Sequence, residues 1–302
     1  MVDKLQQSLG ADYTNEAIYE ALGKTRQGFS QSKQRADFCQ ENENLIISIV
    51  VNWRVNHPRM GSRVMHQSLK AAGIYLGIGI TKFEQLLSKH HLTVGKIKRY
   101  GPKTTDSDGS DKDYPNLTNG LIINDINQLI VADITYFWIK GKWYYLFIFK
   151  DVYSQRVLSI IPSRNMEGLN CHTALKQIVA LRGKASLKGC ILHTDNGGQF
   201  DANEFKSKLI NLAMRISRAE QCEQNGSAEQ INHIVKNMYL KNWSISSFEE
   251  LCEACKVFME LNNSQRAIKQ LGYQTPQGFE AAIAQIPLSK RVKKQLYDFS
   301  NT

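Results

Sequence analysis

Short apolar runs separated by turn-forming residues fill the second half of the chain. Residues 129–138 and 142–149 are rich in β-branched and aromatic residues, and the Lys-Gly pair between them predicts a hairpin turn. A third strand is predicted at 156–161. Strands that pair first as hairpins and then alternate with helices indicate a mixed α/β sheet covered by helices. The alternating part has predicted strands at 190–193 and 214–218 and predicted helices at 166–181 and 202–213.

The first hundred residues have a helical pattern instead. Residues 1–40 are weakly amphipathic, and further helices are predicted at 41–57, 61–72 and 81–91, with Thr81 as the N-cap of the last one. Three short helices joined by tight turns are typical of a small DNA-binding unit of helix-turn-helix type. A generic three-helix scaffold is the alternative.

These patterns divide the chain of 302 residues into one large domain with smaller additions. The predicted segments are an N-terminal helical arm (1–40), a basic helical DNA-binding region (41–104), a linker rich in Pro, Gly, Ser, Thr and Asp (105–120), an α/β core (121–285) and a C-terminal tail (286–302).

Positive charge is concentrated in one block of the chain. The formal net charge is +10, and residues 54–103 carry ten Lys and Arg residues against a single acid, Glu84. Such a block is typical of a surface that binds a polyanion, and nucleic acid is the favoured partner. A solubilising face is the alternative. The candidate DNA contacts are Arg54, Arg59, Arg63, Lys70, Lys96, Lys98 and Arg99.

Nothing in the sequence predicts a membrane partner. The longest apolar run, at 144–149, is too short to cross a bilayer, and the first residues lack the apolar core of a signal peptide. The six cysteines are scattered, as reduced thiols would be. We therefore expect a cytoplasmic protein.

Three carboxylates are the candidate chemistry. Asp133 lies within a predicted strand, Asp195 just beyond the carboxyl end of another, and Glu229 at the start of a helix. Carboxylate oxygens without Cys or His partners suit Mg²⁺ or Mn²⁺. Two such ions stabilise the attacking and leaving oxygens of a phosphoryl displacement, so these residues are the candidate metal ligands and catalytic groups.

The predicted helix after Gly226 separates into two faces. Its polar face would direct a carboxylate and a cation at one phosphate backbone, and it consists of Glu229, Asn232, His233 and Lys236. Its apolar face consists of Ile231, Ile234, Val235 and Met238.

Three residues are candidates to support the carboxylates: His193, Asn232 and His233. His193 faces the same side of an extended segment as Asp195, and either orients a water or phosphate or simply packs. His233 either touches DNA or is exposed to solvent. Asp151 also follows a β-rich run, and we interpret it as structural, holding the turn into the next strand.

Five motifs resemble those of a known family. Residues 133–136 (Asp-Ile-Thr-Tyr), 193–200 (His-Thr-Asp-Asn-Gly-Gly-Gln-Phe) and Ala228-Glu229, with Lys236 seven residues after the glutamate, resemble the three motifs of the DDE-class insertion-sequence transposases. The chain is most similar to the long second-frame product of the IS-three group, which is related to retroviral integrase cores. Residues 57–61 resemble the helical DNA-binding segment of that family, and 271–276 its closing motif.

This resemblance implies an RNase H-like catalytic core at 121–285 and DNA strand cleavage followed by 3′-hydroxyl strand transfer at the ends of a mobile element. It implies two Mg²⁺ ions per active site, with Mn²⁺ as a substitute, held by Asp133, Asp195 and Glu229. Lys236 would contact phosphate. Synapsis of two ends implies a homo-multimer in a bacterial, nucleoid-associated setting, with element-end and target DNA as partners, and with a first-frame helix-turn-helix protein as a further partner or fusion.

The motifs also depart from the family pattern. Gln155 stands at an arginine position, and the late Arg-Pro-His motif reads Arg266-Ala267-Ile268. Two alternatives to a transposase therefore stay open: a catalytically impaired DNA-binding regulator derived from one, and an RNase H-type nuclease acting on RNA–DNA hybrids.

Overall fold

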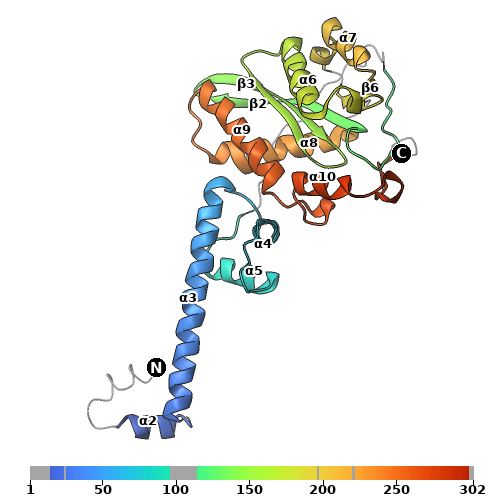
Figure 1. Cartoon of the computed structure of the whole chain (residues 1–302). Helices are drawn as coiled ribbons and strands as arrows, with labels where there is room; N and C mark the ends of the chain where they lie inside the picture. Colours follow the sequence, from blue (N-terminus) through green and yellow to red (C-terminus); the bar gives the residue numbers. More distant parts are fainter. Residues whose placement is uncertain (1–13, 24, 96–113, 196, 220–221, 299–302) are drawn as a thin grey trace. The chain divides into compact units, whose positions relative to one another are not determined.

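The structure is a computed structural model that describes residues 14–23, 25–95, 114–195, 197–219 and 222–298. The chain divides into two compact units, Met1–Val55 and Asn56–Thr302. Helices α2 (Asn15–Ala21) and α3 (Arg26–Asn56) account for the described part of the smaller unit, with the last residue of α3 in the larger one (Figure 1). No helix among the described residues is both long and apolar enough to cross a membrane.

The helix predicted at 41–57 begins earlier than expected, because α3 is continuous over 31 residues from Arg26 to Asn56. Between Gly28 and Pro58 the sequence holds neither glycine nor proline, so nothing in its backbone chemistry interrupts the helix. Ile46 and Val50 are its buried side chains.

Two short helices open the larger unit, α4 (Ser62–Ala71) and α5 (Ile80–Lys89). They confirm the two helices predicted here, but the predicted N-cap is wrong. Gly79 is the N-cap of α5, and Thr81 lies inside its first turn. Both helices bury apolar side chains, namely Met65, Leu69, Phe83, Leu86 and Leu87. The end of the predicted basic region and most of the predicted linker lie outside the described residues.

The core of the larger unit is a five-stranded mixed sheet, which confirms the predicted α/β fold. The spatial order is β4-β3-β2-β5-β6, in which β3 is antiparallel to both β4 and β2, and β5 is parallel to both β2 and β6. The strands are β2 (Leu129–Ile139), β3 (Lys142–Asp151), β4 (Val157–Ser163), β5 (Ile191–Thr194) and β6 (Arg215–Arg218).

The turn between β2 and β3 forms where the sequence predicts it. Lys140 and Gly141 both have positive φ, 41° and 88°, as the central residues of a two-residue hairpin turn require. Consequently Trp138 pairs with Trp143, and the register continues to Ile130 opposite Asp151.

Helices cover both faces of this sheet (Figure 1). On one face α6 (Gly168–Arg182) and α7 (Asn203–Asn211) bury side chains such as Ile130 and Ala132 of β2. On the other face, Phe137 and Ile139 lie beneath a second set of helices. This set is α8 (Gly226–His233), the π-helical turn η5 (Ile234–Tyr239), the short helix η6 (Leu240–Asn242) and α9 (Phe248–Ser264).

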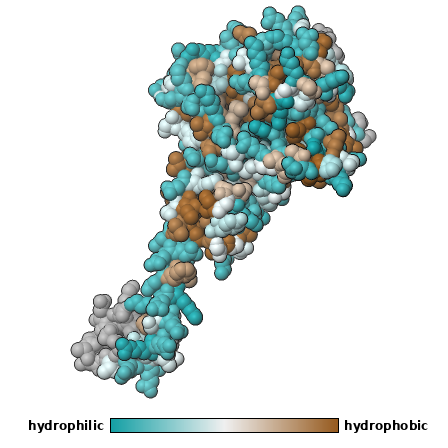
Figure 2. All heavy atoms as spheres, in the orientation of Figure 1, coloured by the Kyte–Doolittle hydropathy of each residue, from teal (hydrophilic) through white to brown (hydrophobic). Residues whose placement is uncertain are grey.

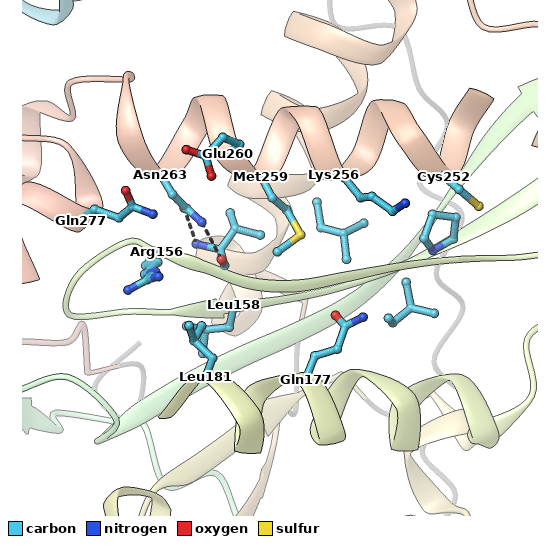
Figure 3. A pocket seen from close by; sticks show the side chains of 14 residues that line it. Arg156, Leu158, Gln177, Leu181, Cys252, Lys256, Met259, Glu260, Asn263 and Gln277 are labelled. Carbon is cyan, nitrogen blue, oxygen red and sulfur yellow. Dashed lines mark hydrogen bonds between the residues drawn. The ribbon is translucent and has the colours of Figure 1, made fainter. Parts of the chain in front are cut away.

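Strand β4 forms one edge of the sheet, and a side-chain amide covers part of it. Asn263 of α9 donates a hydrogen bond to the carbonyl of Val157 (2.8 Å) and accepts one from its N–H (3.0 Å), in the way that a neighbouring strand would (Figure 3). The groove along this edge, of about 490 Å³, is lined by residues of β4, α6 and α9.

The closing motif at 271–276 starts a helix. Gly272 and Tyr273 both have φ of 64°, after which Thr275 caps the N-terminus of α10 (Pro276–Ala284) and Pro276 takes its first position. After α10, β7 (Lys294–Gln295) pairs with β1 (Ile122–Ile123), so part of the predicted tail is paired with the start of the core.

Helix α10 places Glu280 between two arginines. Its carboxylate accepts hydrogen bonds from Arg182 of α6 (2.5 and 2.8 Å) and from Arg156 (2.5 Å), and the Arg182 and Glu280 side chains are only 6% and 10% exposed. This buried ionic group joins α10 to the rest of the core.

We predict that Glu280→Ala lowers the free energy of unfolding by roughly 3 kcal/mol, because it leaves two partly buried guanidinium groups without a carboxylate. Urea denaturation measures the change. The matched control is Glu249→Ala, which removes the exposed partner of Arg164 and should cost less than about 1 kcal/mol. Equal losses in the two variants would contradict the prediction.

Candidate active site

Pairing of β2 with β5 brings two of the three predicted carboxylates together. In the parallel register Ala132 lies beside Thr194, and Asp133 and Asp195 are the next residues along the two segments. Ala132 and its neighbour Leu192 face the α6 side of the sheet. Because side chains alternate along β2, Asp133 faces the α8 side, and Asp195, just beyond the end of β5, is close enough for its charge to act on Asp133.

Asp133 is half-buried, and both of its oxygens accept hydrogen bonds. The N–H of Ile134 donates to Oδ1 (2.8 Å) and Nδ2 of Asn232 donates to Oδ2 (2.6 Å). Burial and, after it, the negative charges of Asp195 and Glu229 together raise the pKa of Asp133 to about 7, against the effect of these hydrogen bonds. The negative charges of Asp133 and Asp195 therefore repel each other in a partly buried site.

Asp195 is positioned by a tight turn and an arginine. Oδ1 of Asp195 accepts a hydrogen bond from the N–H of Gly197 (3.1 Å), and a Cβ on that glycine would lie 3.1 Å from the same oxygen. Arg218, at the end of β6, donates to the carbonyl oxygen of Asp195 (2.9 Å). Burial raises the pKa of Asp195, while the Gly197 bond and the Arg218 charge oppose the rise.

Helix α8 supplies the polar residues above the two aspartates. Its apolar face is buried against the sheet as predicted, and Asn232 on its polar face contacts Asp133 directly. Glu229 lies in the first turn and is exposed, within electrostatic range of Asp133. Of the three predicted carboxylates, Asp133 and Asp195 are neighbours, and the charge of Glu229 acts on Asp133.

The donor atoms present suit a hard divalent cation. Asp133 and Asp195 offer only oxygen, and neutralising their mutual repulsion would favour a cation between them. Throughout the described part of the chain, however, no group of three or more His, Cys, Asp or Glu side chains is arranged to hold a metal ion. Asp133 and Asp195 fit such an ion by chemistry, and Glu229 is not placed as a third ligand in this arrangement.

Lys236 lies next to these carboxylates, in the π-helical turn that follows α8. Its Nζ donates to Oγ1 of Thr135 (2.9 Å) and lies 4.7 Å from the centre of the Tyr136 ring. Burial lowers the pKa of Lys236, and the charge of Lys241 lowers it further, whereas Asp133 opposes this. The predicted cation thus lies two residues along β2 from Asp133.

Comparison with known proteins finds similarity to integrases and insertion-sequence transposases. Residues 124–221 match a family model described as "Integrase core domain". The chain is 27% identical over 273 residues to the "Insertion element IS600 uncharacterized 31 kDa protein" of Shigella sonnei, which covers 88% of this chain and 98% of that protein. It is 22% identical over 235 residues to "Transposase InsF for insertion sequence IS3A" of Escherichia coli K12, with 75% and 79% covered.

The chain is thus similar to insertion-sequence transposases, and its residues 124–221 match the integrase core domain. The resemblance to insertion-sequence transposases is thereby confirmed. Among solved structures, the HTLV-2 integrase catalytic core in complex with magnesium matches 55% of this chain and 99% of that one, at 20% identity and a TM-score of 0.42.

Two histidines near the candidate active site have different surroundings. His193 is 1% exposed and its Nδ1 lies 2.8 Å from Oγ of Ser217, and burial lowers its pKa to about 4. This neutral, enclosed ring matches the packed alternative. His233 is half-buried, with Nδ1 3.1 Å from Nδ2 of Asn237.

The predicted DNA contacts of the helical region are dispersed over the two units. Arg54 belongs to the smaller unit, and burial lowers its pKa. In the larger unit, Arg59 donates to the carbonyl of Gly95 (2.7 Å), Arg63 pairs with Glu84, and Lys70 is exposed. The remaining three, Lys96, Lys98 and Arg99, lie outside the described residues.

One motif with a predicted DNA-binding role is partly structural. His57 is fully buried, with Nδ1 2.8 Å from the Tyr239 hydroxyl and Nε2 3.1 Å from Oε1 of Gln265. Ser68 of α4 accepts a hydrogen bond from the N–H of Ala267 (2.9 Å). The part of the helical region from His57 to Ser68 is therefore joined to later residues of the larger unit.

Sequence patterns missed a buried lysine beneath α8. Lys150 of β3 is 2% exposed and donates to the carbonyl of Ser227 (2.7 Å), two residues before Glu229, and to Oε1 of Gln155 (3.2 Å). Asp151 beside it is structural, as predicted, since it accepts hydrogen bonds from the N–H groups of Asn127 and Ser154. A cation directly after the apolar run 143–149 was the available signal for Lys150.

We predict that Lys150 makes stability depend on pH. Burial, helped by Arg266 and opposed by Asp151, lowers its pKa from 10.5 to about 7. Between these values the unfolded chain binds a proton that the folded chain does not, so stability rises with pH across this window and the full cost is present below about pH 7. Relative to Lys150→Met, the wild type should gain up to about 1.4 kcal/mol per pH unit.

Chemical denaturation of both proteins between pH 7 and pH 9.5 measures this difference. Lys150→Gln should show the same relative slope, because the slope depends on the titrating group and not on the shape of its replacement. A difference that stays constant over this range would show that Lys150 remains charged in the folded state.

Proposed function

We propose that this chain is a DNA transposase that cleaves one strand at the ends of a mobile element and then joins the freed 3′-hydroxyl to a second phosphodiester. Cleavage consumes one water and leaves a 3′-hydroxyl and a 5′-phosphate. Joining forms one phosphodiester bond as it breaks another, so it needs no external energy source. The pairing of Asp133 with Asp195, beneath Asn232 and Lys236, carries this proposal.

Two Mg²⁺ ions, or Mn²⁺ in their place, would be held by Asp133 and Asp195. Glu229, which is exposed in the first turn of α8, would become the third ligand by turning toward them. When bound, they supply positive charge for the attacking and leaving oxygens. Asn232 fixes the orientation of the Asp133 carboxylate through its 2.6 Å hydrogen bond, so that the free lone pairs of that group are aimed consistently.

The chain's own residues would position the DNA. Lys236 offers an ammonium group beside Asp133, where it can bind a phosphate next to the one that reacts. The basic residues of the helical region would bind the duplex through its phosphates, which makes affinity fall steeply with salt. Two element ends must meet, so we expect a homo-multimer, with a first-frame protein as a further partner.

We predict that the wild type forms joined products from labelled element-end DNA in the presence of Mg²⁺ or Mn²⁺, and that Glu229→Gln forms none. The loss should exceed about a hundredfold, because the variant would lack one ligand of the metal ions. Gel analysis of labelled strands separates cleaved from joined products. Asp133→Asn and Asp195→Asn should behave in the same way.

The control is Glu204→Gln, which changes an exposed glutamate of α7 and should leave joining intact. Cleavage without joining by the wild type would favour an RNase H-type nuclease. Salt-sensitive DNA binding with neither activity, even after addition of a first-frame protein, would favour a DNA-binding regulator and overturn the proposal.

A further inference from the structure

Strand β2 has an open edge immediately beyond the two aspartates. Its pairing with β5 ends at Ala132, whereas its pairing with β3 continues to Ile139. Within the described residues, the stretch 133–139 therefore has β3 as its single neighbouring strand. Side chains from both faces of the sheet can meet around this edge.

Three aromatic side chains are exposed on the hairpin at this edge. Tyr136, Trp138 and Trp143 are 42%, 51% and 52% exposed. Trp143 packs edge-on against both others, with ring centres 4.7 Å from Trp138 and 5.2 Å from Tyr136. On the face of the larger unit drawn in Figure 2, hydrophobic residues are interspersed with hydrophilic ones. Two adjacent exposed tryptophans leave a large apolar area in water and indicate a binding surface.

These rings line a hollow that also contains lysines. The cavity measures about 900 Å³, and its lining includes Tyr136, Trp138, Trp143, Trp243, Lys236 and Lys241. We call it the aromatic cleft. Lys236 belongs both to this cleft and to the candidate active site, so the two are continuous.

The charge of the aromatic cleft is positive. Lys236 and Lys241 are close enough for the charge of Lys241 to act on Lys236, and no aspartate or glutamate is among the lining residues. In the described part of the chain neither lysine forms a salt bridge with a carboxylate. A ligand that carries negative charge and also has flat apolar faces complements such a lining.

We propose that the aromatic cleft stacks unpaired nucleotides of the DNA strand that leads to Asp133. This inference rests on the proposed function and names the form of DNA that the site takes. Aromatic faces stack bases of any sequence, while the lysines bind the phosphates between them. Paired bases inside a duplex do not expose their faces, so the ligand is single-stranded.

The distances along β2 suit this assignment. Trp138 lies five residues from Asp133, which is roughly 17 Å at 3.4 Å per residue in an extended strand. Stacked bases repeat at about 3.4 Å along one strand, so only a few nucleotides separate the cleft from the reacting phosphate. A protein partner fits less well, because two close lysines would have to be desolvated without a carboxylate on this chain to offset them.

The test compares the full chain with Trp138→Ala/Trp143→Ala on two probes, without divalent ions so that no chemistry occurs. One probe is a blunt duplex and the other is the same duplex with a short single-stranded tail, tested in both polarities. Fluorescence anisotropy gives the affinities. Wild type should bind a tailed probe about tenfold more tightly than the blunt one, and the double variant should lose this preference while keeping its affinity for the blunt duplex.

Two further variants keep the result interpretable. Trp138→Phe/Trp143→Phe retains the ring faces and should keep most of the preference, which a general loss of folding would not allow. Tyr297→Ala removes an aromatic side chain that is 64% exposed next to β7 and should change nothing. Equal affinity of wild type for tailed and blunt probes, or an unchanged preference in the double alanine variant, would overturn the inference and favour a protein-binding surface.

This outcome is independent of the proposed chemistry. If the protein prefers tailed DNA through its tryptophans but joins no strands, the inference about the aromatic cleft stands and the proposed transposase function fails. If it joins strands without any preference for tailed DNA, the proposed function stands and the inference about the cleft fails.

Discussion

The side-by-side placement of Asp133 and Asp195 is the constraint around which the larger unit is organised. It follows from the parallel pairing of β2 with β5, which sets Ala132 beside Thr194 and leaves the two carboxylates next in line. Burying two like charges is unfavourable, and the pKa of Asp133, raised to about 7, expresses that cost. The hydrogen bonds from Asn232 and from the turn at Gly197 offset part of it. A bound cation would offset more of this repulsion between the carboxylates than the hydrogen bonds do.

Other buried polar groups hold the elements that surround this pair. Lys150 of β3 donates a hydrogen bond to the first turn of α8. Glu280 joins α10 to α6 and to Arg156, just before β4. Each interaction costs desolvation that an apolar side chain would avoid. Each of these groups joins a helix to a defined point of the sheet or of another helix, in addition to the hydrophobic packing of that helix.

Patterns of local chemistry predicted most of this arrangement. The hairpin turn at Lys140 and Gly141, the alternation after it and the apolar face of α8 all follow from neighbours in sequence. Errors occurred where the competing signal was weak, as at Thr81, or where no breaker was present, as in α3. The roles of Lys150 and His57 were beyond reach, because each depends on a partner at least 77 residues away. Glu229 was singled out by its motif, yet its exposure depends on how α8 is seated.

Two strand edges of the sheet, at β4 and at the outer half of β2, are treated differently, and the contrast bears on function. Unpaired strand edges favour unwanted association, and proteins usually cover them. At β4 the amide of Asn263 substitutes for a missing strand. At the outer half of β2, which β5 does not reach, exposed aromatic rings and two lysines stand instead, and they leave a hollow of about 900 Å³. A surface evolved only against aggregation would carry charge there and few aromatic rings. Retaining tryptophans at the edge nearest the carboxylates is understandable if a ligand with flat, anionic units covers them during the reaction.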